Sequence, residues 1–85
     1  MGLEIVITRN AAKDLLNLPN TDRGRVERRV EAYALAPDGQ GHDVVALVGT
    51  RGLYRLRSGD WRVVFEIDGG TMQILSVLHR REAYR

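Results

Sequence analysis

The sequence predicts an α+β fold in the order β-α-α-β-β-β, in which two N-terminal helices pack on one face of a mostly antiparallel four-stranded sheet. Three observations predict it. A short β-branched segment opens the chain, two stretches with helical spacing of apolar residues follow, and the second half alternates strand-like segments with tight turns. A chain of 85 residues has room for one core only, so we expect residues 1–85 to form a single domain.

The first strand and the first helix are predicted within the first 18 residues. Residues 3–8 are short and β-branched, which is typical of a strand covered on at least one face. Either Thr8 or Asn10 caps the helix that follows, because both side chains accept a hydrogen bond from a backbone N–H of the first turn. The helix is expected to reach about Leu18, where Pro19 stops it. Its expected apolar stripe is Ala12, Leu15 and either Leu16 or Leu18.

A second helix is predicted to run to Ala36. The segment Asn20-Thr21-Asp22 is a signal for its N-terminus, and Pro37-Asp38-Gly39 ends it. Apolar side chains recur at spacings of four and three residues, at Val26, Val30 and Tyr33. The outward face holds three arginines: Arg25, Arg28 and Arg29.

The remaining residues predict a meander of strands. Residues 53–57, 61–68 and 71–79 read as strands, and the segments between them, Ser58-Gly59-Asp60 and Gly69-Gly70, read as tight turns. The loop before them contains a short apolar stretch from Val44 to Val48. That stretch is either a strand stub or a helical turn.

Strand alternation gathers arginines on one face of this sheet. Arg55 and Arg57 point to the same side of their strand. The strongly apolar face of the next strand must meet the helices, and it consists of Trp61, Val63, Phe65 and Ile67. Arg62 is therefore expected on the open face beside Arg55 and Arg57, and the basic ending from His79 to Arg85 follows the last strand. Several cations are thereby gathered on one surface without matching acidic residues there. A single arginine on a strand is most often a solvated residue whose aliphatic stem covers its neighbours. Several like charges on one face instead favour a polyanionic ligand.

Composition excludes several classes of function. The chain has no cysteine, its two histidines lack metal-ligand spacing and it has no phosphate-binding glycine motif, so neither a metal nor a cofactor is expected. The apolar runs are too short for a signal peptide or a membrane span, which predicts a cytoplasmic protein without a membrane partner. All basic residues except Lys13 are arginine. This bias fits a phosphate ligand, or else a genome that encodes arginine wherever lysine would serve.

Several segments together carry a family resemblance: LYRLRSGDWRVVF at residues 53–65, the EID that follows, the ending HRREAYR, TRNAAK at residues 8–13, and Leu18-Pro19. In these segments the chain resembles the RelE toxins of the RelE/ParE superfamily, and the resemblance spans the chain. It implies a toxin of a type II toxin–antitoxin system that cleaves mRNA in the ribosomal A site. It also implies neutralisation by a small acidic RelB-like antitoxin whose C-terminal segment wraps the toxin.

The resemblance also implies roles for particular residues. Arg62 matches the strand arginine that contacts the scissile phosphate, Arg55 matches a basic strand position, and Tyr84 matches the terminal tyrosine. Arg80, or alternatively Arg81, matches the arginine near the C-terminus. These are the expected catalytic residues, and the expected RNA-binding residues are Arg57, His79, Arg81 and Arg85. The sequence departs from the family in having Leu53 where some members have lysine, and no C-terminal helix is expected.

The residue types suit metal-independent cleavage by the RNA 2′-hydroxyl. Arginine stabilises the charge of a phosphorane but is a poor proton carrier at neutral pH. Tyr84 is then the leading candidate for the base, because neighbouring arginines favour its phenolate. The general acid is left open. The alternatives are a ParE-like inhibitor of DNA gyrase that does not act as an enzyme, or a degenerate toxin that only binds an antitoxin.

Overall fold

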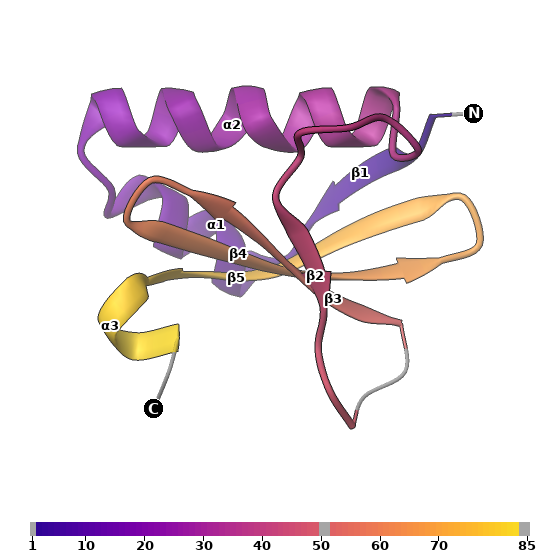
Figure 1. Ribbon diagram of the computed structural model, residues 1–85. Coiled ribbons are helices and arrows are strands. Elements are labelled where there is room, and N and C mark those ends of the chain that lie inside the picture. Colours follow the sequence, from indigo (N-terminus) through magenta and orange to yellow (C-terminus); the bar gives the residue numbers. More distant parts are fainter. Residues whose placement is uncertain (1, 50–51, 84–85) are drawn as a thin grey trace.

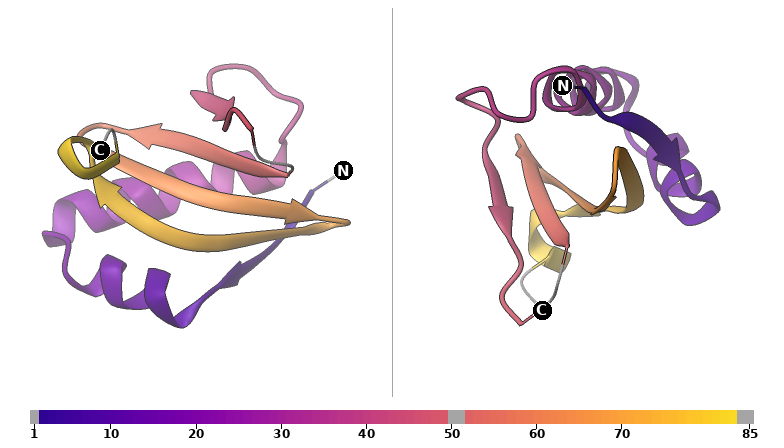
Figure 2. Two further views of the ribbon diagram at one scale, coloured as in Figure 1. Left: turned by 90° about the horizontal axis from the view of Figure 1, so that it is seen from below. Right: turned by 90° about the vertical axis from the view of Figure 1, so that its right-hand side faces the viewer.

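The structure is a computed structural model that describes residues 2–49 and 52–83. One five-stranded sheet has the order β1-β5-β4-β3-β2, and two helices, α1 and α2, lie on one side of it (Figures 1 and 2). The elements are β1 Glu4–Ile7, α1 Arg9–Leu16, α2 Asn20–Leu35, β2 Val44–Ala46, β3 Leu53–Ser58, β4 Trp61–Asp68, β5 Thr71–His79 and α3 Arg80–Ala83. The predicted α+β class is confirmed, and the predicted elements occur in the predicted order, with β2 and α3 in addition.

The sheet has one strand more than predicted. The segment 44–46 is β2, which pairs antiparallel with β3 at the sheet edge, so the open choice between a strand stub and a helical turn is decided for a strand. Among the strands of the described ranges, only β1 and β5 pair in parallel, which confirms a mostly antiparallel sheet. No helix in the described part of the chain is long and apolar enough to cross a membrane.

Thr8 caps α1, as one of the two predicted alternatives requires. Its Oγ1 accepts a hydrogen bond from the Ala11 N–H at 3.2 Å and donates to the Ile74 carbonyl at 2.8 Å, so it joins the helix to β5. Of the predicted stripe, Leu15 and Leu18 are buried, so the open choice is decided for Leu18 and against Leu16, which is 72% exposed. The prediction of Ala12 was wrong, because the buried alanine is Ala11. The buried stripe of α1 and the turn after it is Ala11, Leu15 and Leu18.

The second helix begins at the predicted place but without the predicted cap. Pro19 is its N-cap residue and makes no side-chain cap hydrogen bond. Asp22 is used elsewhere: its Oδ2 accepts a hydrogen bond from Trp61 Nε1 at 3.0 Å. The predicted apolar side of α2 is buried as Val26, Val30 and Tyr33. Asp22 therefore joins α2 to the start of β4.

The core lies between the helices and the inner face of the sheet. Phe65 is 0% exposed and packs between Tyr33 and Tyr54, with ring centroids at 5.3 and 5.6 Å. Its neighbours Leu56, Val63 and Met72 are also fully buried, whereas Trp61 and Ile67 of the predicted apolar face lie at the core's edge. A β-bulge opposite the Val64–Phe65 step adds one residue to β5, so Ile74 and Val77 both face the core.

Candidate functional site

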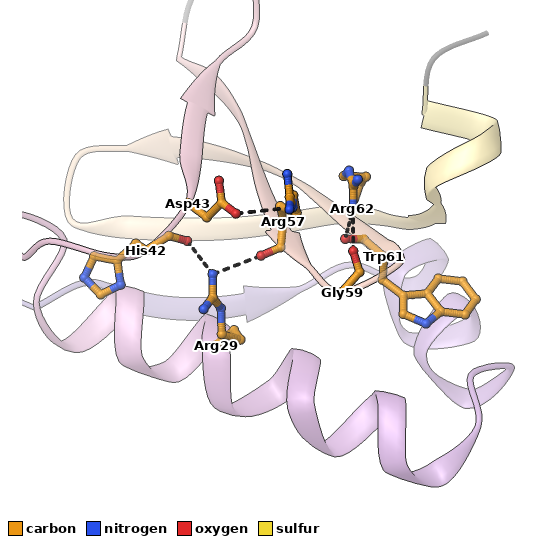
Figure 3. Close-up of polar contacts among 7 residues, drawn as sticks. All are labelled: Arg29, His42, Asp43, Arg57, Gly59, Trp61 and Arg62. Carbon is orange, nitrogen blue, oxygen red and sulfur yellow. Dashed lines mark hydrogen bonds and ion pairs between the residues drawn. The ribbon is translucent and has the colours of Figure 1, made fainter.

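The arginines of β3 and β4 share the sheet face that points away from the helices. Arg57 lies directly opposite Arg62 in the antiparallel register, and Arg55 lies opposite Val64 one pair further along. Figure 3 shows the Arg57 and Arg62 side chains projecting to the same side of the sheet, away from α2. Alternation along two paired strands therefore brings Arg55, Arg57 and Arg62 onto one surface, which we call the arginine face.

Arg62 is buried, and the prediction that it lies exposed on an open face was wrong. Only 6% of its surface is accessible. Its Nη1 donates hydrogen bonds to the carbonyls of Gly59 at 2.9 Å and Trp61 at 3.0 Å (Figure 3). Strand alternation sets the side on which a residue lies, but not what covers it there. The side chain of Arg62 is thus held by the β3–β4 turn.

The basic surface also has acidic partners, contrary to the sequence analysis. Arg57 Nε lies 3.4 Å from Asp43 Oδ2, and Arg80 Nη1 lies 3.6 Å from Asp60 Oδ1. All four side chains are at least half exposed, so each pair is worth no more than about 1 kcal/mol. Both acids come from loops and turns, to which strand alternation does not apply. Such weak pairs leave the arginines free to exchange partners with a ligand.

The β3–β4 turn brings Arg62 and Arg80 to one place. The turn carbonyls of Gly59 and Trp61 hold Arg62, while the Arg80 N–H donates to the Asp60 carbonyl at 2.7 Å. Gly59 has φ +58°, a left-handed conformation that favours glycine. The predicted catalytic arginines of β4 and of the C-terminal segment therefore depend on the same tight turn.

A short helix follows β5, although no C-terminal helix was expected. The four residues Arg80–Ala83 form α3. His79 stabilises its start, because its Nδ1 accepts the Arg81 N–H at 3.3 Å and its own N–H donates to Glu82 Oε1 at 3.4 Å. The His79 ring also packs edge-on against Trp61 at 5.2 Å. These contacts give His79 a structural role.

Two predicted site residues, Tyr84 and Arg85, lie outside the described residues. Arg81 is exposed on α3. Among residues 2–49 and 52–83, no three His, Asp or Glu side chains gather closely enough to hold a metal ion.

Burial raises the pKa of Tyr33, and the nearby Tyr54 and Asp38 raise it further. Tyr33 is a buried residue of α2, and its neutral phenol ring packs against Phe65 in the core.

Sequence reasoning missed the role of Arg29, which joins α2 to the sheet. Its Nη2 donates to the carbonyls of His42 and Arg57, both at 3.0 Å (Figure 3). These bonds hold in place the C-terminal end of β3, which carries the Arg57 side chain. The contact spans three segments of the chain, so neither helical spacing nor strand alternation contains a signal for it.

Comparison with known proteins defines the class as toxins of type II toxin–antitoxin systems. The family model described as "ParE toxin of type II toxin-antitoxin system, parDE" matches residues 5–84. The chain belongs to this family of toxins. Toxin RelE3 of Methanocaldococcus jannaschii is 26% identical in an 84-residue alignment that covers 96% of this chain and 96% of that one. The resemblance to the RelE/ParE superfamily is thereby confirmed.

Two solved structures share both fold and sequence with the chain. The RelE–RelB complex of Pyrococcus horikoshii OT3 is 28% identical with a TM-score of 0.78, covering 94% of this chain and 97% of that one. The toxin–antitoxin complex RelBE2 of Mycobacterium tuberculosis is 26% identical with a TM-score of 0.76, covering 94% of this chain and 100% of that one. Both agree with the α+β architecture described above.

Proposed function

We propose that this toxin is a ribosome-dependent endoribonuclease that cleaves mRNA in the A site. The observation that carries the proposal is the cross-strand pair of Arg57 and Arg62 with Arg55 beside it. Like charges directly opposite each other destabilise a sheet, so a ligand rich in phosphate stabilises this arrangement. The kinship with RelE toxins supports RNA as that ligand.

The proposed reaction needs no external nucleophile. The 2′-oxygen attacks the adjacent phosphorus, and the bond from phosphorus to the 5′-oxygen breaks. A 2′,3′-cyclic phosphate forms, while the 5′-oxygen takes up a proton and leaves as a 5′-hydroxyl. Arg55, Arg62 and Arg80 supply positive charge to the phosphorane. The carbonyls of Gly59 and Trp61 accept hydrogen bonds from Arg62 and hold its guanidinium group in one orientation before RNA binds. Little reorganisation of this side chain is then needed at the moment of reaction. Tyr84 is the proposed base that takes the 2′-hydroxyl proton.

The exposed cations around this site are proposed to hold the RNA strand. Arg57 and Arg81 are both exposed, and their positions on β3 and α3 flank the β3–β4 turn. His79 contributes by stabilising α3 and thereby the position of Arg81. Arg85 is proposed to add a further phosphate contact. A ribosomal target implies that the protein acts in the cytoplasm.

The proposed regulator is a small, acidic, RelB-like antitoxin. The relatives from P. horikoshii and M. tuberculosis are toxin–antitoxin complexes. An acidic segment that folds on binding neutralises arginines such as Arg55 and Arg57 and covers them against RNA. Binding of the antitoxin and inhibition of the toxin are then one event.

A ParE-like inhibitor of DNA gyrase is the second candidate, and two observations favour it. The matching family model is described as ParE, and the buried Arg62 has little surface to offer to a phosphate. The two functions differ in what they stop. An endoribonuclease stops translation by cutting mRNA, whereas a gyrase inhibitor stops replication and leaves mRNA whole.

Induction of the toxin in a bacterial host separates the two candidates. We expect 5′-end mapping of total RNA to detect new cuts within translated messages, and no cuts in the same messages when their start codons are removed. A host that expresses the Arg62→Ala variant is the control. Replication arrest with intact mRNA would reject the endoribonuclease and favour the gyrase inhibitor.

A double charge reversal, Arg55→Glu with Arg57→Glu, is expected to weaken cleavage and antitoxin binding together. Both ligands need the arginine face, and Arg57→Glu also sets a second carboxylate beside Asp43. Calorimetric titration with the antitoxin and an in-vitro translation assay measure the two effects. Loss of cleavage with parental antitoxin affinity would mean that the antitoxin acts elsewhere on the toxin.

A further inference from the structure

A hollow lies between α2 and the β3–β4 turn, and it shares only Arg57 with the arginine face. Its volume is about 440 Å³. Three arginines of α2 (Arg25, Arg28 and Arg29), the residues Asp43 and Arg57, and the start of the β3–β4 turn line it. Among the described residues, no aliphatic or aromatic side chain belongs to this lining. The hollow therefore suits a charged, hydrated ligand.

Charge is distributed unevenly around α2. Three of its four arginines line the hollow, whereas Glu27 and Glu31 line a separate apolar cavity toward β1, and the fourth arginine, Arg23, lies beside Glu27 at another hollow. Arg25 stands three and four residues before Arg28 and Arg29, the spacings at which like charges on a helix repel each other. An anion in the hollow would relieve this repulsion.

Two of the three arginines that α2 contributes to the hollow have their guanidinium groups available. Arg29 is engaged, because its Nη2 donates to the carbonyls of His42 and Arg57. Arg25 and Arg28 are exposed, and neither makes a hydrogen bond or an ion pair with another residue in the described ranges. Arg29 therefore fixes the wall of the hollow, while Arg25 and Arg28 are placed to contact a ligand.

We propose that this hollow binds the sugar–phosphate backbone of RNA, at a site separate from the arginine face. The planar forks of Arg25 and Arg28 match phosphate oxygens, which a nucleic-acid backbone offers at every nucleotide. Arg57 lies at the rim of the hollow, while its side chain projects to the opposite sheet face (Figure 3). An RNA strand that leaves the arginine face at Arg57 reaches α2 next.

This inference goes beyond the proposed function, because it concerns binding and not cleavage. It is tested with a short fluorescein-labelled 2′-O-methyl RNA, which cannot be cut by internal attack, so binding is measured whether or not the protein cleaves RNA. The variant is R25Q/R28Q. Fluorescence anisotropy across a series of salt concentrations gives the affinity and its salt dependence.

We expect R25Q/R28Q to lower the magnitude of the slope of log K against log salt by about 1.4 and to weaken binding roughly 25-fold at about 0.1 M salt, the effect of losing two single-strand phosphate contacts. R25K/R28K keeps both charges and is expected to retain most of the affinity. If the double glutamine variant melts below the parent, the single variants R25Q and R28Q replace it, each with about half the change in slope.

The matched control is R9Q/K13Q, which removes the same charge from exposed positions of α1. Its affinity for the RNA is expected to stay near that of the parent. Parental RNA binding by R25Q/R28Q would overturn the proposal, as would an equal loss in the α1 control, since the effect would then reflect net charge alone. A poly-glutamate peptide is titrated in parallel. Loss of peptide binding with unchanged RNA binding would also overturn the proposal and assign the hollow to an acidic protein segment.

Discussion

Replacement of Arg62 by alanine is expected to abolish most of the toxin's activity and to lower its stability at the same time. Loss of one preorganised charge at the phosphorane should slow cleavage by on the order of 10²–10³. The buried guanidinium group of Arg62 also donates hydrogen bonds to two backbone carbonyls, so its removal should lower the free energy of unfolding by about 1–3 kcal/mol. For a domain of this size that lowers the melting temperature by about 4–8 °C for each kcal/mol.

The measurement must separate the two effects of the Arg62→Ala change. Cleavage of a translated message is assayed well below the melting temperature, so that every variant is folded. Arg9→Ala removes an equal charge from an exposed position on α1 and should leave both cleavage and melting unchanged. Arg62→Lys keeps the charge without the planar fork and should give intermediate cleavage. An Arg62→Ala protein that cleaves at the parental rate once folded would reduce Arg62 to a structural residue of the turn.

Local pattern was sufficient for most of the fold. The alternation of β4 identified Val63 and Phe65 as core residues, and both are fully buried. Helical spacing identified the buried side of α2 through Val26 and Val30. These predictions succeeded because the periods of a helix and a strand are set by the backbone, and the core then selects the apolar side.

The remaining features depend on contacts between distant segments, which no local pattern encodes. The strand β2 has three residues and is defined only by its pairing with β3. The bulge in β5 breaks the two-residue period, so alternation alone would misplace Val77 relative to Ile74. At the candidate site, the burial of Arg62 and the pairing of Arg57 with Asp43 likewise follow from how turns fold back on the sheet.

The convergence of Arg29 and Arg57 has the same origin. From the sequence, the arginines of α2 belong to an outward helix face and those of β3 to a sheet face. In the structure, Arg29 donates to the Arg57 carbonyl, and the two basic groups meet at the end of β3. The arginines of each element can be read from the sequence, but the contact between α2 and β3 cannot, because it joins residues 28 positions apart.

Replacement of Phe65 by alanine is expected to unfold the domain or to leave it barely stable. Phe65 is 0% exposed and packs against both Tyr33 and Tyr54. Truncation of a buried phenylalanine costs about 3–5 kcal/mol. At the usual stability per residue, a domain of this length has roughly 4–13 kcal/mol in all. The loss is therefore a large part of the total, and at the lower end it equals the whole.

Chemical denaturation followed by circular dichroism measures this loss, with Phe65→Leu included because it keeps most of the apolar volume and should remain folded with a smaller loss. Leu35→Ala is the matched control, since Leu35 is 79% exposed and its truncation should change stability by no more than about 0.5 kcal/mol. A Phe65→Ala protein with the parental midpoint and slope would show that Phe65 does not anchor the core. The helices would then have to pack on the other face of the sheet, and the arginine face would no longer be open to a ligand.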